Sequence, residues 1–268
     1  MANNLVTVCI LTTKFPMEVL KSLGNQTYRN FEISLAREDG IVKALNLALV
    51  RANGDIFVRL DDDVEMPPNW LEELVKPFSD PQVAGVTGPT FVPKELRQNR
   101  DSIRWAENPN WFLRWLYDNG EFNPAGIRKC GCVSYDSNYE ERFIDRNGFF
   151  GEYEPDHLEG TNWAMRTALV RKVLGFDPKF DGVSEWIDDD VVFKVKKLGF
   201  KLAYNPKAYL YHLLGGGEHF NNRFDGFGRL KNWLRFHIRH SKFHPKMVIY
   251  FTIWSLYFLR KSWQSRKK

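Results

Sequence analysis

Three neighbouring aspartates, Asp61, Asp62 and Asp63, directly follow a short apolar run. Their carboxylates are candidates for binding a metal ion. Like charges placed side by side repel one another, and a bound cation would remove this cost. Carboxylate oxygens are the ligands that Mg²⁺ and Mn²⁺ prefer, and such ions keep positions open for phosphate oxygens. Successive side chains of an extended segment alternate in direction, so Asp61 and Asp63 point to one side and Asp62 to the other. We therefore expect a metal site built on Asp61 and Asp63.

A second group of acids, Asp188, Asp189 and Asp190, begins a segment whose apolar residues have helical spacing. One of these carboxylates could act as a general base, because the N-terminus of a helix that faces a cleft can hold a base within reach of a hydroxyl. A structural interpretation is also open, in which Asp188 is the N-cap and the next two acids complement the helix dipole. The same alternative applies to the triplet at 61–63, which precedes another predicted helix.

Alternating strands and helices must position these acids. The expected strands are 6–11, 31–36, 56–60 and 83–88, and the expected helices are 17–23, 41–52 and about 69–75. This order predicts an α/β fold with a doubly wound, mostly parallel sheet and helices on both faces. The carboxyl ends of the first three strands then bring Thr12-Thr13-Lys14, Arg37-Glu38-Asp39 and the acidic triplet to one edge of the sheet, where ligands of such folds bind.

Residues 93–158 break this alternation, because they are rich in Arg, Asn, Trp and Tyr and show no sustained period. A long irregular segment in a compact domain is typical of a lid or a binding loop, so we interpret it as an insertion with a function of its own. Its Trp105, Trp111 and Trp115 could stack on an acceptor sugar or form a small core. Cys130 and Cys132 have no second pair to complete four ligands and do not predict a metal site.

Regular structure returns after the insertion. The expected elements are helices at 167–174 and 189–198, a strand-like run at 201–212, and helices at 228–240 and 246–260. His212, at the end of the strand-like run, could complete a metal site or be an ordinary surface residue. The next stretch, 213–223, contains three glycines together with His219 and Arg223. It could close over a diphosphate or be a plain connector.

The composition predicts a folded, cytoplasmic protein. The chain has 268 residues, of which 43% are hydrophobic and 15% aromatic, enough to bury a core. Three cysteines are too few for a disulfide scaffold, and no leader sequence precedes the first predicted strand. The longest apolar run, 247–259, has thirteen residues, whereas a membrane-spanning helix needs about 20.

The charge is unevenly distributed along the chain. Residues 221–268 contain twelve Lys or Arg and one acid, a net charge of +11, whereas the remaining 26 basic and 32 acidic residues give residues 1–220 a net charge of −6. A basic tail with Trp233, Trp254 and Trp263 suggests an anionic partner, either a membrane face or nucleic acid. The basic residues on both sides of the run 247–259 favour a membrane, on which residues 228–268 would lie, and we expect no nucleic acid. The alternative is that the apolar side chains of this run pack on the domain or on a second subunit.

Four segments resemble, in the same order, motifs of the inverting glycosyltransferases of family two, which have a GT-A fold and use nucleotide-diphosphate sugars. They are VTVCILTTKFPMEVLKSLGNQTYRNFEI, REDGIVKALNLALVRANGDIFVRLDDD, HLEGTNWAMRTALVRKVLGFDPKF and IDDDVVFKVKKLGFKLAYNPKAYLYH. The second contains the Asp-x-Asp motif of the family, and the last is similar to its E-D-x-D…P-x-A-x-x-x-H block. The resemblance covers residues 5–92 and 157–213, about half of the chain.

The resemblance implies roles for individual residues. Asp63 would ligate Mn²⁺ or Mg²⁺ between the diphosphate oxygens, Asp61 would touch the ribose or the metal, and His212 would complete the metal site. Asp188 would be the general base, but Ile187 stands where the family has Glu, so Asp189 is the alternative. The side chains implied to bind the donor are Thr12, Thr13, Asp39, Lys43, Asn46, Asp61 and Asp62.

The expected activity is metal-dependent transfer of a sugar, with inversion, from a UDP, GDP or dTDP sugar to a hydroxyl of a glycan or a lipid-linked acceptor. The expected domains are a catalytic domain at 1–220 (nucleotide-binding half 1–92, insertion 93–158, acceptor half 159–220) and a basic helical tail at 221–268. The protein would lie at the inner face of the cell membrane and could form a homo-oligomer. One alternative, a sugar-phosphate nucleotidyltransferase, would need a glycine-rich basic loop that TTKFPMEV lacks. The other, a non-catalytic membrane-binding or nucleic-acid-binding module, would not need both acid groups intact.

Overall fold

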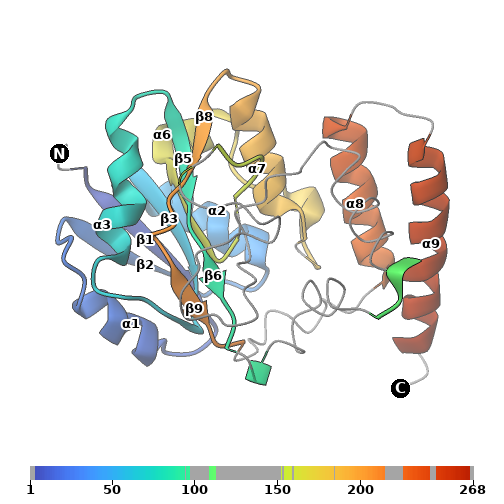
Figure 1. Cartoon of the computed structure of the whole chain (residues 1–268), viewed down its shortest axis with the longest axis horizontal. Coiled ribbons are helices and arrows are strands. Elements are labelled where there is room, and N and C mark those ends of the chain that lie inside the picture. The colour runs from blue at the N-terminus through green and yellow to red at the C-terminus, as the bar shows by residue number, and fades with distance from the viewer. Residues whose placement is uncertain are drawn as a thin grey trace.

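The computed structural model describes residues 4–93, 95–96, 109–112, 152, 154–158, 160–183, 185–214, 226–241 and 246–265. Figure 1 shows a sheet flanked by helices, with two C-terminal helices, α8 and α9, beside it. The central sheet has six strands in the order β2-β1-β3-β7-β5-β8. Their bounds are β1 Val6–Leu11, β2 Phe31–Ala36, β3 Ile56–Asp61, β5 Val83–Thr87, β7 Asn162–Arg166 and β8 Lys201–Tyr204.

The central sheet is mostly parallel, as predicted. β1 pairs in parallel with β2 and β3, and β5 pairs in parallel with β8, whereas β7 runs antiparallel between β3 and β5. The sequence did not predict β7, because its residues NWAMR include no β-branched side chain. Pairing with a neighbour on each side makes this segment a strand in spite of its composition.

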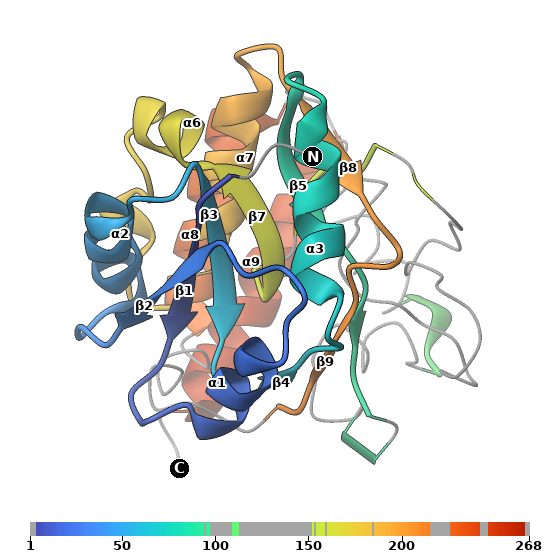
Figure 2. The ribbon, with the colours of Figure 1, turned by 90° about the vertical axis from the view of Figure 1, so that its left-hand side faces the viewer.

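Helices cover both faces of the sheet, and the side chains of β1 show the division. Val6, Val8 and Ile10 belong to one core cluster and Cys9 and Leu11 to the other, as expected for alternating side chains. In Figure 2, α1 and α3 lie on the viewer's side of the sheet, with α7 and α8 behind it. The described part of the chain before α8 includes the helices α1 Met17–Gly24, α2 Ile41–Arg51, α3 Trp70–Val75, α6 Thr167–Lys172 and α7 Ile187–Lys196, with 3-10 turns at Lys76–Ser79 and Pro178–Phe180.

A second, three-stranded sheet has the order β4-β9-β6 and consists of β4 Val64–Glu65, β6 Thr90–Phe91 and β9 Leu210–His212. The prediction of one strand over 201–212 was wrong, because this run forms β8 in one sheet and β9 in the other. Asn205 ends β8, where its side chain accepts from the backbone N–H of Lys207 at 3.0 Å and donates to the carbonyl of Glu73 at 2.9 Å. This turn redirects the chain so that His212 reaches the end of β3.

Two helices follow, α8 (Gly226–His240) and α9 (Lys246–Ser265), close to the predicted bounds. α8 packs on the start of α7, where the rings of Phe236 and Trp186 stack with centroids 4.6 Å apart. α9 packs on α8, and the rings of Phe251 and Trp233 lie 6.1 Å apart. In the part of the chain that the structure describes, no helix has both the length and the apolar character needed to cross a membrane.

A buried carboxylate, Asp190 of α7, bonds to basic side chains of α8. Its Oδ1 accepts a hydrogen bond from Arg239 at 2.8 Å and lies 2.8 Å from His240 Nε2, while its Oδ2 lies 2.6 Å from Lys194 Nζ. Burial alone would raise the pKa of Asp190, but the bonds from His240, Lys194 and Arg239 outweigh burial and lower this pKa to about 2. Asp190 therefore has a structural role at this helix pair.

We expect Asp190→Asn to lower the free energy of unfolding by about 3 kcal/mol, because it removes the anion that three basic side chains share at a buried site, of which Arg239 also pairs with Asp177. The lowered pKa corresponds to about 2 kcal/mol of stability, which is present above the ordinary aspartate pKa and is lost as the pH falls through about 2. Urea unfolding at neutral and acidic pH measures both effects. Asp156→Asn, at a partly exposed ion pair of 3.9 Å with Lys196, is the control, and equal stability of the two variants would contradict this role.

Candidate active site

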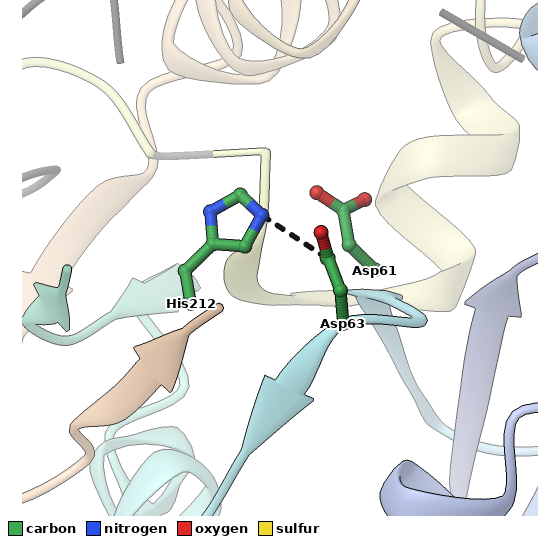
Figure 3. A group of neighbouring side chains, drawn as sticks. All are labelled: Asp61, Asp63 and His212. Atoms are coloured by element: carbon green, nitrogen blue, oxygen red, sulfur yellow. Dashed lines mark ion pairs between the residues drawn. The ribbon is translucent and has the colours of Figure 1, made fainter. Parts of the chain in front are cut away.

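Asp61, Asp63 and His212 come together at the carboxyl end of β3, as Figure 3 shows. One ligand atom of each residue lies within 4.8 Å of those of the other two, and His212 Nε2 is 3.1 Å from Asp63 Oδ1. The small sheet produces this grouping, because β4 begins directly after Asp63 and pairs with β9 so that Val64 lies opposite His212. The three residues that the family resemblance implied as metal ligands are therefore neighbours.

The buried carboxylate of Asp61 is only partly satisfied by the protein. Its Oδ2 accepts a hydrogen bond from Thr161 Oγ1 at 2.9 Å, whereas its Oδ1 has no hydrogen-bond donor among the described residues and lies 3.6 Å from Arg59 Nη2. A buried anionic oxygen without a donor is costly, and a cation beside it would remove that cost. Two carboxylates and an imidazole are ligands that Mn²⁺ accepts. The residues present therefore fit Mn²⁺ or Mg²⁺.

Asp62 is outside this cluster and connects two strand ends. Its Oδ2 lies 2.7 Å from the hydroxyl of Thr12, which is buried and also accepts a hydrogen bond from the N–H of Lys14 at 3.1 Å. The end of β1 is thus in contact with the end of β3, as the strand order predicted. Thr13 is exposed. Contact of these residues with a nucleotide stays a prediction.

The other predicted donor-binding residues lie at α2. Asp39 is exposed before the helix and Lys43 is exposed in its first turn, so both are accessible to a ligand. Asn46 is held by the backbone of Phe176, because its amide nitrogen donates to the carbonyl of Phe176 at 2.7 Å and its oxygen accepts from the N–H of Phe176 at 2.9 Å. Contact of Asn46 with the donor stays a prediction.

Asp188 lies in the first turn of α7. It is not the N-cap, because the helix begins at Ile187 and the capping residue is Trp186, in the left-handed conformation with φ 70°. The two carboxylate oxygens of Asp188 accept hydrogen bonds from Arg59 Nη1 and, at 3.1 Å, from Trp163 Nε1. Burial raises the pKa of Asp188 above its ordinary value, against the opposing charge of Arg59. A raised pKa makes this carboxylate a stronger base.

Asp189 has different surroundings. Its Oδ1 lies 2.7 Å from His157 Nδ1, and the two side chains are 14% and 6% exposed. Arg59 contacts both Asp188 and Asp61, so Asp188 is the acid of this turn that lies beside the metal cluster. The assignment of Asp188 as the base, with Asp189 as the alternative, stays a prediction. The two carboxylates nevertheless have different hydrogen-bond and ion-pair partners.

Residues 17–173, more than half of the chain, match the family model described as glycosyl transferase family 2. The chain belongs to glycosyl transferase family 2. This membership confirms the resemblance and makes the protein a glycosyltransferase, which sets aside the nucleotidyltransferase alternative. The matched residues include Asp61 and Asp63 and end before Asp188 and His212. No sequence among the curated proteins matches the chain.

Two solved structures show the same fold at low sequence identity. The mannosyltransferase PcManGT from Pyrobaculum calidifontis, in complex with GDP-Man and Mn²⁺, is 16% identical with a TM-score of 0.52, over 97% of this chain and 73% of its own. TarS residues 1–349 from S. aureus, in complex with UDP-GlcNAc, is 14% identical with a TM-score of 0.52, over 97% of this chain and 72% of its own. These similarities confirm the GT-A type of α/β fold.

The structure adds residues to this family-two site that the sequence did not suggest. Arg59, Thr161 and Trp163 contact Asp61 or Asp188, and His157 contacts Asp189. One signal was present in the sequence, because Arg59 interrupts the apolar run of a buried strand and a buried cation requires an anionic partner. The other three lie in or next to β7, a strand that the sequence did not predict. Trp105, Trp115, Cys130, Cys132, His219 and Arg223 lie outside the described residues, and Trp111 is 70% exposed.

Gly160 offers a test of the contact between Arg59 and Asp188. A Cβ at this position would lie 2.7 Å from Asp188 Oδ2 and closer still to Arg59 Nη1. We expect Gly160→Ala to displace this pair and to lower turnover by roughly tenfold or more, because small misplacements of catalytic groups are costly. Gly24→Ala is the matched control, since a Cβ there meets nothing within 4 Å. Unchanged turnover of Gly160→Ala, measured beside its thermal unfolding, would show that the pair does not matter for catalysis.

Proposed function

We propose that this glycosyltransferase moves a sugar, with inversion, from a nucleotide-diphosphate sugar to an acceptor hydroxyl in a metal-dependent reaction. The observation that carries the proposal is the convergence of Asp61, Asp63 and His212 at the carboxyl end of β3, where one buried oxygen of Asp61 lacks a donor in the part of the chain that the structure describes. Ligands of open α/β sheets bind at such strand ends. The GDP-Man and Mn²⁺ of PcManGT and the UDP-GlcNAc of TarS support the same class of donor.

The chain supplies the donor site from three elements. Asp61, Asp63 and His212 would hold Mn²⁺ or Mg²⁺, which when bound would neutralise charge on the departing diphosphate. Thr161 fixes the carboxylate of Asp61 through its hydrogen bond, so the side chain is oriented before a donor arrives. Thr12, Thr13, Asp39, Lys43 and Asp62 would contact the nucleotide. Asp62 and Thr12 already hold the ends of β1 and β3 together.

The proposed base is Asp188, which would take the proton of the acceptor hydroxyl while that oxygen attacks the anomeric carbon from the face opposite the leaving group. Burial raises the pKa of Asp188, which favours proton uptake, and Arg59 and Trp163 fix the position of its carboxylate. Attack from the opposite face inverts the anomeric configuration. Asp189, beside His157, is the alternative base.

We further propose that the donor is a UDP, GDP or dTDP sugar and that the acceptor is a glycan or a lipid-linked molecule. A lipid-linked acceptor would place the enzyme in the cytoplasm at the inner face of the cell membrane. The basic C-terminal helices suit that location, because their charge is opposite to that of anionic lipids. A homo-oligomer is compatible with this arrangement.

A screen of nucleotide sugars tests the proposal. The full-length protein is incubated with UDP-, GDP- and dTDP-linked sugars in the presence of Mn²⁺, Mg²⁺ or a chelator, and release of the nucleoside diphosphate is measured. We expect metal-dependent release from one class of donor, and none with the chelator. Failure to consume any donor, or consumption that the chelator leaves unchanged, would contradict the proposal. Once an acceptor is identified, NMR of the product measures its anomeric configuration and distinguishes inversion from retention.

A further inference from the structure

One side of α9 exposes large aliphatic side chains. Val248, Ile249, Leu256 and Leu259 are 57%, 57%, 64% and 48% exposed, and we call these four residues the exposed α9 face. At about 100° per residue they fall within one arc of roughly 100°. Trp263 lies on the same arc and is 61% exposed. Four large aliphatic side chains on one arc of a helix, each about half exposed or more, indicate an interaction site.

The other side of α9 is already used by the fold. Ile253 and Tyr257 pack against the large core cluster, which includes Trp233 and Phe236 of α8. Packing on the domain, the alternative for the whole apolar run, therefore applies to Ile253 and Tyr257. It does not apply to the exposed α9 face. The side chain of Trp254 lies outside the described residues.

Charge indicates which partner covers the face. From Gly226 to the end of the chain the sequence has eleven Lys or Arg and no acid, and the exposed Arg260 lies directly beside the face. A second copy that used the same face would bring two strongly basic segments together and would be repelled. The phosphates of a nucleic acid would pair with the basic side chains, but they would make no favourable contact with the four aliphatic side chains. An anionic lipid surface accepts both the charge and the apolar side chains.

We propose that the exposed α9 face docks on an anionic lipid bilayer, with α9 lying in the headgroup region. The helix has 20 residues but is not apolar enough to cross a membrane, which is typical of a helix that lies at the interface. Trp263 and Arg260 are residue types that favour this boundary. The four aliphatic side chains enter the acyl region, and the basic side chains contact lipid phosphates.

The docked helix is joined firmly to the catalytic acids. α8 lies between α7 and α9 (Figure 1), and it is fixed to α7 by the Asp190–Arg239 ion pair and by the stacking of Phe236 on Trp186. Trp186 directly precedes the helical turn that carries Asp188. Docking through α9 therefore sets the orientation of that turn relative to the bilayer. The consequence, access to a membrane-borne acceptor, rests on the proposed transferase function.

Vesicle binding tests the docking. The full-length protein is co-sedimented at low salt with phosphatidylcholine vesicles that contain about one-third phosphatidylserine, and with vesicles of phosphatidylcholine alone. We expect binding to the anionic vesicles and at least tenfold weaker binding by the double variant Ile249→Gln/Leu256→Gln. Val50→Gln, which changes an apolar residue of α2 that is 75% exposed, is the matched control and should bind like the wild type. Arg260→Gln should weaken binding by about fivefold, against no change for Lys201→Gln at the exposed start of β8.

Three results would overturn the docking proposal. They are absence of binding to anionic vesicles, equal binding by the double variant and the wild type, and a wild-type dimer that the double variant converts to a monomer, which would assign the face to a second copy. Metal-dependent release of nucleoside diphosphate without vesicles is measured on the same samples, and it should be equal in the wild type and the double variant. If the wild type shows this activity but does not bind anionic vesicles, the docking proposal alone is overturned. Vesicle binding without any such activity overturns the transferase proposal alone.

Discussion

Asp63→Asn is expected to abolish the metal-dependent part of nucleotide diphosphate binding, a loss of about a hundredfold or more, while the protein stays folded. The substitution removes a charged ligand beside Asp61 and His212 and leaves the polar volume of the side chain nearly unchanged. Because a divalent ion held by these residues would supply positive charge for a diphosphate, the nucleotide should lose affinity together with the metal. Calorimetry with UDP or GDP, with and without Mn²⁺, measures the loss.

Glu65→Gln is the matched control for Asp63→Asn. Glu65 lies two residues further along, is exposed, and belongs to β4, so the variant removes one negative charge from the same segment without touching the cluster. It should bind Mn²⁺ and nucleotide like the wild type. If Asp63→Asn binds the nucleotide with unchanged affinity in Mn²⁺, or if the two variants lose affinity equally, the assignment of the metal site is wrong.

Much of the fold could be predicted from the sequence, because its first part obeys simple periodicity. The strands at β1, β2, β3 and β5 are short apolar runs, and their alternation with helices requires a mostly parallel sheet. β7 was not predicted, since its pairing partners β3 and β5 lie far away in sequence and only Trp163 among its own residues favours a strand. The split between β8 and β9 was not predicted either, because it depends on the contact of Asn205 with the carbonyl of Glu73.

The candidate site could be predicted only in part for the same reason. Asp61 and Asp63 are separated by one residue in the sequence, and His212 was proposed beside them by the family resemblance. The contacts that fix the proposed base were not foreseen, because Arg59 and Trp163 come from two strands and reach Asp188 only in the folded sheet. The surroundings of Asn46 were not foreseen either. It matched a family position, but only the structure shows its amide bonded to the backbone of Phe176.

The second large effect is expected for Asp188→Asn, which should keep donor binding and lose about a hundredfold or more in turnover, because a base acts in the chemical step. Burial raises the pKa of Asp188, so wild-type turnover should fall as the pH drops through that raised pKa and the carboxylate becomes protonated. An asparagine cannot take the proton at any pH. The residual activity of the variant should therefore lack this acidic limb, and turnover measured against pH under saturating donor tests both points.

Asp189, the next residue, provides the control variant and is also the alternative base. Asp189→Asn removes the same charge one residue later, at a carboxylate paired with His157, and should retain most of the turnover. If Asp189→Asn is inactive while Asp188→Asn is active, the base is Asp189 and the alignment with the family block is off by one. If Asp188→Asn loses donor binding together with turnover, Asp188 acts through Arg59 on the position of Asp61 and is not the base, since Arg59 contacts both carboxylates. Thermal unfolding of each variant separates these outcomes from loss of the fold, because Asp188→Asn leaves the buried Arg59 with Asp61 as its remaining anionic contact among the described residues.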